Sequence, residues 1–165
     1  MAAATKNSYE AIRADILKGQ FHPVYLLMGD EGYFIDRLTE LLEEKVLTET
    51  EKDFNMLTFY GVDSDVHNIT AAARRYPMMA EHQLIVVKEA QNLPKFEELD
   101  HYVSNPMPST VLVINYRHGK VDKRKALVKN IEKIGVVFES KKLYDNQIPP
   151  FIVSWFREQS ITIDE

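Results

Sequence analysis

The sequence predicts a three-layer α/β domain in which a five-stranded, mostly parallel sheet lies between two layers of helices. Short and almost wholly apolar runs recur along the chain, and stretches with apolar residues at helical spacing separate them. Continuous apolar strands are typical of a parallel sheet that is covered on both faces and joined by right-handed crossovers. The 165 residues suit one domain that buries roughly 70% of its unfolded surface.

Helices and strands are expected to alternate from one end of the chain to the other. The helices carry apolar stripes over 9–17, 34–42, 66–73, 96–103 and 127–134. The strands are the apolar runs 24–28, 56–60, 84–87, 110–114 and 136–139. Gly19 and Gly135 are expected to stop helices. Asp63 or Ser64 is expected to cap the third helix, and Asp122 the last.

The carboxyl-terminal segment, 144–165, differs from the rest. A turn at 144–146 is followed by Pro149 and Pro150, either of which suits the first position of a helix. An apolar stripe then follows, made of Ile152, Trp155 and Phe156. We therefore predict one domain over 1–143, and over 144–165 a linker with the first helix of a second, truncated domain.

Composition excludes several classes of protein. The absence of cysteine removes disulfides, thiolate catalysis and sulfur-rich metal sites, and agrees with a reducing cytoplasm. No run approaches the ~20 apolar residues of a membrane span, and the first residues contain no apolar signal core. We therefore expect a cytoplasmic protein with no membrane partner.

Charge is distributed unevenly along the chain. The net charge of −5 argues against a free-standing nucleic-acid binder. Residues 29–53 hold nine acids and three bases, whereas residues 117–133 hold seven bases and two acids. Such a division suits a protein that docks against other macromolecules by different faces.

The turn after the first strand, 29–35, lacks the residues of a phosphate-binding loop. That loop needs G-x-x-x-x-G-K-[ST], and here Phe34 and Ile35 stand at the glycine and lysine positions. Asp30 and Glu31 would repel a polyphosphate, and are better explained as helix-capping residues. Weak anion binding at the helix N-terminus stays open, but nucleotide hydrolysis is not expected.

Other catalytic patterns are absent too. The five histidines are scattered, no G-x-S-x-G motif occurs, and Lys88 stands where many nucleotidases place an acidic metal ligand. We predict no catalytic, cofactor-binding or metal-binding residue.

Two consecutive methionines, Met78 and Met79, directly precede the third strand. Neighbouring residues on a helix point about 100° apart, so both cannot face one core from regular structure. One of them is expected to face outward, where the flexible thioether suits a docking surface. The alternative is that both cover the edge of the sheet from inside.

Four blocks of sequence, taken in order, carry a resemblance to a known family. They are PVYLLMGDEGYFIDR (23–37), RYPMMAEHQLIVVKEAQNL (75–93), PSTVLVINYRHGKVDKRKALVK (108–129) and KKLYDNQIPPFIVSWFREQSITI (141–163). This chain resembles the N-terminal domain of the delta subunit of bacterial DNA polymerase III, the wrench of the clamp loader. The resemblance implies an AAA+-like P-loop NTPase fold with a degenerate phosphate loop, followed by a lid and a helical collar.

The resemblance also implies a function in DNA replication. The family is non-catalytic: it binds the ring-shaped sliding clamp (beta subunit) and helps to open it. Other loader subunits (gamma/tau and delta prime) accompany it, ATP hydrolysis takes place in other subunits, and DNA is reached through the assembled complex.

The same resemblance points to site residues. Met78 and Met79 match an apolar pair that plugs a pocket on the clamp, where the family often has leucine or phenylalanine. Tyr76 and Pro77 would shape the approach to this pair. Ala80 and Glu81 would form its rim.

A second surface and two rival hypotheses stay open. Lys125, Lys129 and Lys133 line one helix face, either as a solvated face or as a contact with DNA or a neighbouring subunit. One rival is a small nucleotide-dependent enzyme, similar to an ATPase or kinase, in which a lysine or arginine reaches the turn 29–32 from elsewhere. The other is a DNA-binding module.

Overall fold

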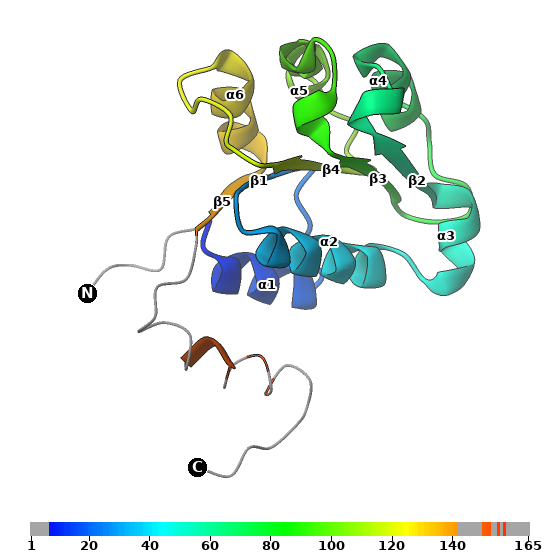
Figure 1. Ribbon diagram of the computed structural model, residues 1–165. Helices are drawn as coiled ribbons and strands as arrows, with labels where there is room; N and C mark the ends of the chain where they lie inside the picture. Colours follow the sequence, from blue (N-terminus) through cyan, green and yellow to red (C-terminus); the bar gives the residue numbers. More distant parts are fainter. Residues whose placement is uncertain (1–6, 142–149, 153–154, 156, 158–165) are drawn as a thin grey trace.

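The computed structural model, which describes residues 7–141, 150–152, 155 and 157, has a five-stranded sheet between two layers of helices (Figure 1). The strands are β1 (Val24–Gly29), β2 (Met56–Tyr60), β3 (Gln83–Lys88), β4 (Thr110–Arg117) and β5 (Val136–Ser140). Their order across the sheet is β2-β3-β4-β1-β5. Every pairing is parallel, so the expected fold class is confirmed.

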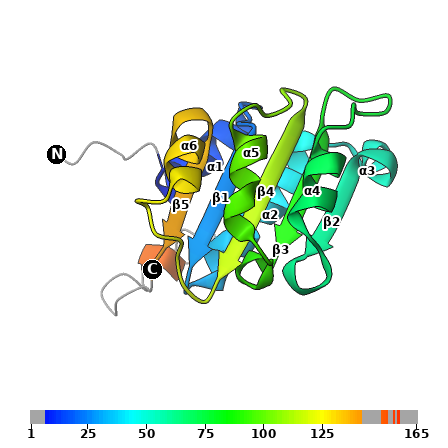
Figure 2. The same cartoon turned by 90° about the horizontal axis from the view of Figure 1, so that it is seen from above.

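Helices cover both faces of the sheet. On one face lie α1 (Tyr9–Leu17) and α2 (Gly32–Val46). On the other lie α4 (Val66–Ala73), α5 (Asp100–Val103) and α6 (Ala126–Ile134), side by side in Figure 2. A further short helix, α3 (Glu49–Asn55), lies at the edge of the sheet beside β2.

The sheet divides the apolar core into two halves. Successive strand residues point to opposite faces, so Leu26 packs with the layer of α4, α5 and α6, whereas Leu27 packs with α1 and α2. Ile85 and Val86 on β3 divide in the same way. Because β1 is buried along its whole length and β3 along nearly all of it, these strands have no polar face, as the sequence predicted.

Several predicted helix ends are corrected. Asp65, not Asp63 or Ser64, caps α4, accepting a hydrogen bond from the Asn68 N–H at 2.8 Å. Asp122 does not cap α6, because its carboxylate accepts instead from the Arg124 N–H at 2.9 Å and the helix begins later. Asp63 and Asp65 offer the same oxygen acceptors, so residue type alone does not tell which of them caps α4.

Other element predictions have mixed outcomes. Gly19, with φ of 77°, and Gly135 do end α1 and α6. The helix expected over 96–103 is a 3₁₀ turn, Phe96–Leu99, followed by the single turn of α5. Helix α3 was not predicted. Its signal was the pair Thr48 and Glu51, which form a capping box.

The tail is described only in part. The predicted turn at 144–146, Pro149, Phe156 and the last residues lie outside the described residues, and the predicted domain boundary lies among them. Residues 150–152 are helical, and the Phe151 ring packs against Tyr33 and Phe34 with centroids 5.2 Å and 5.5 Å apart. Within the described part, no helix is both long and apolar enough to cross a membrane.

Candidate functional site

The methionine pair lies on the loop that joins α4 to β3, which we call the methionine loop (residues 74–82). This loop reaches the sheet at the amino end of β3, and α3 reaches it at the amino end of β2. Both therefore lie at the amino ends of the strands. Ligands of parallel sheets usually bind at the opposite, carboxyl ends. Figure 2 shows α3 and this loop at one corner of the molecule.

Both methionine side chains face solvent. Met78 is 60% exposed and Met79 is fully exposed, and Tyr76 beside them is 81% exposed. The alternative in which both cover the sheet edge from inside is thus wrong, and outward orientation holds for two residues instead of one. The cause is local: Met79 has a φ of 55°, a left-handed conformation rare for a bulky residue. That irregular backbone allows both side chains to leave the core.

The other predicted residues of this loop lie around the pair. Pro77 and Ala80 are half-buried, and Glu81 is exposed. All six residues that the sequence singled out, 76–81, therefore lie in one loop at the surface.

A buried side chain anchors the middle of the loop. Asn55, the last residue of α3, is only 3% exposed. Its Oδ1 accepts a hydrogen bond from the Met78 N–H at 2.6 Å, and its Nδ2 donates to the Met78 carbonyl at 2.9 Å. The same Nδ2 also donates to the Glu51 carbonyl at 3.0 Å, which joins the loop to the body of α3.

A second buried side chain anchors the start of the loop. The Nε2 of Gln83 donates to the carbonyls of Ala72 at 2.8 Å and Arg75 at 3.0 Å, and to Thr110 Oγ1 at 2.9 Å. It thereby adds a donor to carbonyls at and just beyond the carboxyl end of α4, where backbone acceptors lack the regular helical partner. Arg74 is held as well, since its guanidinium donates to the Asn105 carbonyl at 2.9 Å. The loop is therefore fixed by polar contacts at its base while its apolar side chains stay in solvent.

The sequence interpretation missed part of this corner. Phe54, next to Asn55, is 70% exposed, and Leu57 on β2 is 39% exposed. Neither was predicted to be part of a binding surface. The seven residues of α3, ETEKDFN, contain one apolar side chain and therefore show no apolar stripe. The capping box was the available signal for α3.

The turn after β1 is closed by the chain itself. Glu31 caps α2, its Oε1 accepting from the Tyr33 N–H at 3.2 Å. The Glu31 N–H donates to Ser140 Oγ at 3.1 Å. Gly29, at φ of 123°, lies so close to Ser140 that a Cβ there would overlap it. Amide groups that would face phosphate oxygens in a phosphate-binding loop thus serve internal hydrogen bonds.

A cation does reach this turn, as the enzyme hypothesis requires. The guanidinium of Arg117, at the end of β4, lies over Gly32, where an added Cβ would be 3.0 Å from it. Its charge is already paired, because Arg117 forms an ion pair with Asp36 on the next turn of α2. The arrangement offers no free cation to a polyphosphate.

A polar cavity of about 790 Å³ opens at the carboxyl ends of β2, β3 and β4, against α2. Its walls include the carboxylates of Asp36, Glu40 and Glu43, with Lys88 and Arg117 facing them. Burial raises the pKa of Glu43, and the charge of Lys88 offsets part of that rise. The described residues contain no group of histidines and carboxylates able to hold a metal ion. The three carboxylates make this lining unfavourable for a nucleotide phosphate.

The three lysines of the predicted basic face are accessible to solvent. Lys125, Lys129 and Lys133 are exposed along α6. Two neighbouring cations share one carboxylate: Lys123 lies 3.1 Å from Glu139, and Lys120 lies 3.4 Å from it. No carboxylate of the described residues is within ion-pair distance of the three helix lysines, so their charge is available to a partner.

Comparison with known proteins gives one family. A family model described as DNA polymerase III, delta subunit, matches residues 25–141. The DNA polymerase III subunit delta of Bacillus subtilis (strain 168) is 31% identical over 156 residues, which cover 88% of this chain and 45% of that protein. The solved structure of the Bacillus subtilis DNA clamp loader delta protein is 27% identical and matches with a TM-score of 0.81, covering 95% of this chain and 49% of that one. The chain thus spans about half the length of these relatives.

More distant structures share the fold alone. A DNA polymerase III gamma subunit-related protein of Thermotoga maritima matches with a TM-score of 0.57 at 14% identity, over 91% of this chain and 52% of that one. A mutant RuvB of the same organism matches with a TM-score of 0.50 at 17% identity, over 94% of this chain and 51% of that one. The expected AAA+-like fold is confirmed.

Proposed function

Since this chain belongs to the DNA polymerase III delta subunit family, as its four sequence blocks predicted, we propose that it binds the sliding clamp and helps to open it. In this role it acts as a non-catalytic, cytoplasmic subunit of a clamp loader during DNA replication. The observation that carries the proposal is the pair Met78 and Met79, exposed on a loop that the buried side chains of Asn55 and Gln83 hold by hydrogen bonds.

Exposed apolar side chains on an anchored loop favour association. Burying both methionines in an apolar pocket of the clamp contributes roughly 3–6 kcal/mol before the costs of association. Because Asn55 already holds the Met78 backbone, less conformational freedom is lost when the partner binds. This free energy is large enough for a central hot spot of the interface, and contacts around the pair supply the rest of the affinity.

Clamp opening follows from differential binding. The methionine pair must bind more tightly to the distorted ring than to the closed ring, because a ligand that binds both states equally shifts nothing. Tyr76 and Pro77 shape the approach of the pair, with Ala80 and Glu81 at its rim. The turn after β1 of this chain is closed by Ser140 and Glu31, so the energy for cycling between states comes from ATP hydrolysis in other subunits. The gamma/tau and delta prime subunits accompany this chain in the loader.

The basic face of α6 supplies a second contact. Lys125, Lys129 and Lys133 are exposed and unpaired by the described carboxylates. We propose that they face the DNA backbone or an acidic surface of a neighbouring subunit in the assembled loader. Binding of DNA by this chain alone is expected to be weak and strongly salt-dependent, given its net charge of −5.

The proposal is tested with the 165-residue chain and the purified sliding clamp of the same organism, by calorimetry. We expect the Met78→Ser/Met79→Ser variant to bind at least about 100-fold more weakly, from the loss of roughly 3 kcal/mol or more. The matched control is Leu17→Ser/Val62→Ser, which also removes two exposed apolar side chains but lies elsewhere.

Each result has a definite meaning. All four side chains are at least 46% exposed, so circular dichroism should match the wild type in both variants, and the melting temperatures should stay within a few degrees of it. Loss of binding in the methionine variant alone supports the docking site. Equal binding by all three proteins would refute the methionine assignment, and absence of binding by the wild-type chain would refute clamp docking by this part of the protein.

A further inference from the structure

We propose that Phe54 is a third apolar contact of the clamp-docking surface, held in register with the methionine loop by Asn55. This inference rests on the proposed function and extends it to α3, an element that the family resemblance did not indicate. The sliding clamp would then meet two segments of the chain, the methionine loop and the end of α3, as one surface.

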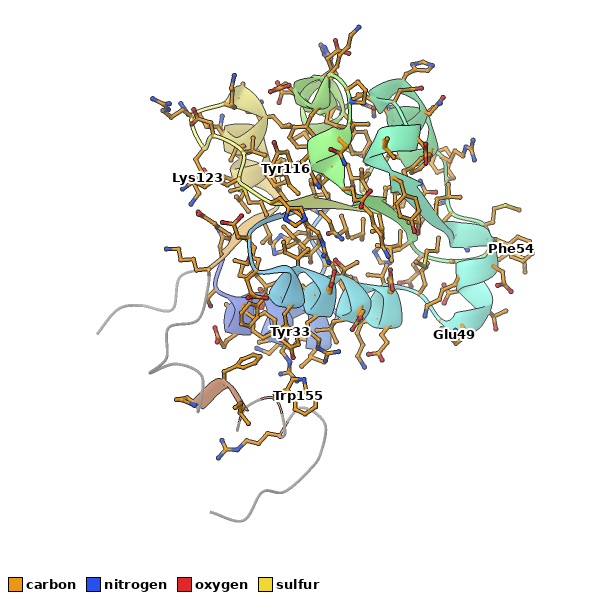
Figure 3. The ribbon with its side chains drawn as sticks, viewed as in Figure 1. Tyr33, Glu49, Phe54, Tyr116, Lys123 and Trp155 are labelled. Carbon is orange, nitrogen blue, oxygen red and sulfur yellow. The ribbon has the colours of Figure 1, made fainter. Side chains whose placement is uncertain are left out.

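The residue pattern of α3 is the reverse of an ordinary surface helix. Of its seven residues, ETEKDFN, the polar Asn55 is the buried one. Phe54, its one large apolar side chain, is 70% exposed. Amphipathic helices bury apolar side chains and expose polar ones, because burying a polar group without partners is costly. Here Asn55 has its partners in the methionine loop, and Phe54 extends outward from α3 at the edge of the molecule (Figure 3).

Phe54 is rigidly placed relative to Met78. The two residues Phe54 and Asn55 are consecutive, so their Cα atoms lie about 3.8 Å apart. Asn55 in turn bonds both main-chain polar groups of Met78, at 2.6 Å and 2.9 Å. The start of α3 is fixed as well, by the reciprocal hydrogen bonds of Thr48 and Glu51 at 3.2 Å and 3.3 Å. Little freedom therefore remains between the phenylalanine and the methionine loop.

The size of a specific interface indicates that the partner of the methionines also covers Phe54. Such interfaces bury about 800 Å² on each partner, which is far more than two methionine side chains offer. The surface must therefore extend onto neighbouring residues, and α3 is the element directly bonded to the loop. Aromatic side chains are also enriched among the residues that dominate binding energy. The occupant is accordingly the clamp, which would contact Phe54 beside the methionine pair.

The experiment compares Phe54→Ser with Val62→Ser in the 165-residue chain, against the purified sliding clamp. Val62 is a matched control because it is 65% exposed and lies just beyond the opposite, carboxyl end of β2. We expect Phe54→Ser to weaken binding about tenfold or more, as for an interface hot spot. Val62→Ser should bind within about twofold of the wild type, and Phe54→Leu, which keeps an apolar side chain, should recover most of the affinity.

The methionine double variant, measured alongside, separates this inference from the proposed function. Wild-type affinity in Phe54→Ser, together with lost binding in Met78→Ser/Met79→Ser, would overturn the role of Phe54 and leave the proposed function intact. Wild-type affinity in both variants would overturn both. A tenfold loss that Phe54→Leu restores, at an unchanged melting temperature, would support the extended surface.

Discussion

The side-chain amide of Asn55 pairs with both main-chain polar groups of Met78, as a residue of a neighbouring strand would. The two residues are 23 positions apart, yet the contact distances are 2.6 Å and 2.9 Å. A single buried side chain thus substitutes for sheet pairing where the methionine loop runs beside α3. The main-chain polar groups of Met78 therefore have partners inside the protein, while its side chain stays exposed.

Asn55→Asp is expected to weaken clamp binding although it leaves both methionines in place. The carboxylate keeps the acceptor for the Met78 N–H but removes the donors to Met78 and Glu51, with a loss of stability of about 1–3 kcal/mol. We expect binding about tenfold weaker at a temperature where the variant is folded. In the Met78→Ser/Met79→Ser background the same change should have less than about a twofold effect. Additive effects in this double-mutant cycle would contradict a positioning role.

Gln83→Leu is expected to destabilise the fold by about 2–4 kcal/mol. Leucine has a similar volume, but it removes the side-chain donor to the carbonyl of the buried Ala72, to Thr110 Oγ1 and to the partly buried Arg75 carbonyl. The Arg75 N–H remains as a longer bond to Ala72, at 3.2 Å. Urea unfolding measures the change, with Gln20→Leu as a control because Gln20 is exposed. A loss no larger than that of the control would mean that water replaces these hydrogen bonds.

Glu43→Gln is expected to raise stability at neutral pH. Burial raises the pKa of Glu43 in the folded protein, so the folded state binds this proton more tightly than the unfolded chain does. Stability contributed by the protonated form is therefore complete below the unfolded pKa and is lost as pH rises through the folded pKa. Glutamine cannot ionise and avoids that loss.

The effect of Glu43→Gln should depend on pH. Because Glu43 is only partly buried, we expect a gain of about 1–2 °C in melting temperature at pH 7, from roughly half a kcal/mol. At pH 4 the gain should disappear. Glu44→Gln is the control, since Glu44 is exposed. A gain that is constant between pH 4 and pH 7 would exclude ionisation as its cause.

Magnesium with ATP is expected to leave the melting temperature within about 0.5 °C of its value without nucleotide. A ligand stabilises the folded state by RT ln(1 + L/Kd), where L is the free ligand concentration, so a ligand whose Kd is far above its concentration has almost no effect. Glu31 and Ser140 occupy the hydrogen-bonding groups of the turn after β1, and Asp36 neutralises Arg117. Differential scanning fluorimetry at millimolar nucleotide makes the measurement. A saturable rise of several degrees would revive the hypothesis of a nucleotide-dependent enzyme.

The sequence alone determined the fold class and the absence of a phosphate-binding loop. Runs such as 84–87 and 110–114 have no polar face, so they can only be buried on both sides, and that condition leads to a parallel sheet between helices. Phe34 and Ile35 cannot supply the glycine amides or the lysine of a phosphate-binding loop. Such properties depend on residue type and short spacing, which are visible without a structure.

Only the tertiary structure decided how the docking corner is built. Asn55 has the same chemistry on a surface or in a core, and its burial depends on Met78, which is distant in the chain. The exposure of both Met78 and Met79 depends on a left-handed backbone at Met79, which residue type disfavours. Arg117 reaches Gly32 only because β4 lies beside β1 in the sheet. Long-range contacts choose among conformations that are locally similar in energy, and those contacts exist only after the sheet has formed.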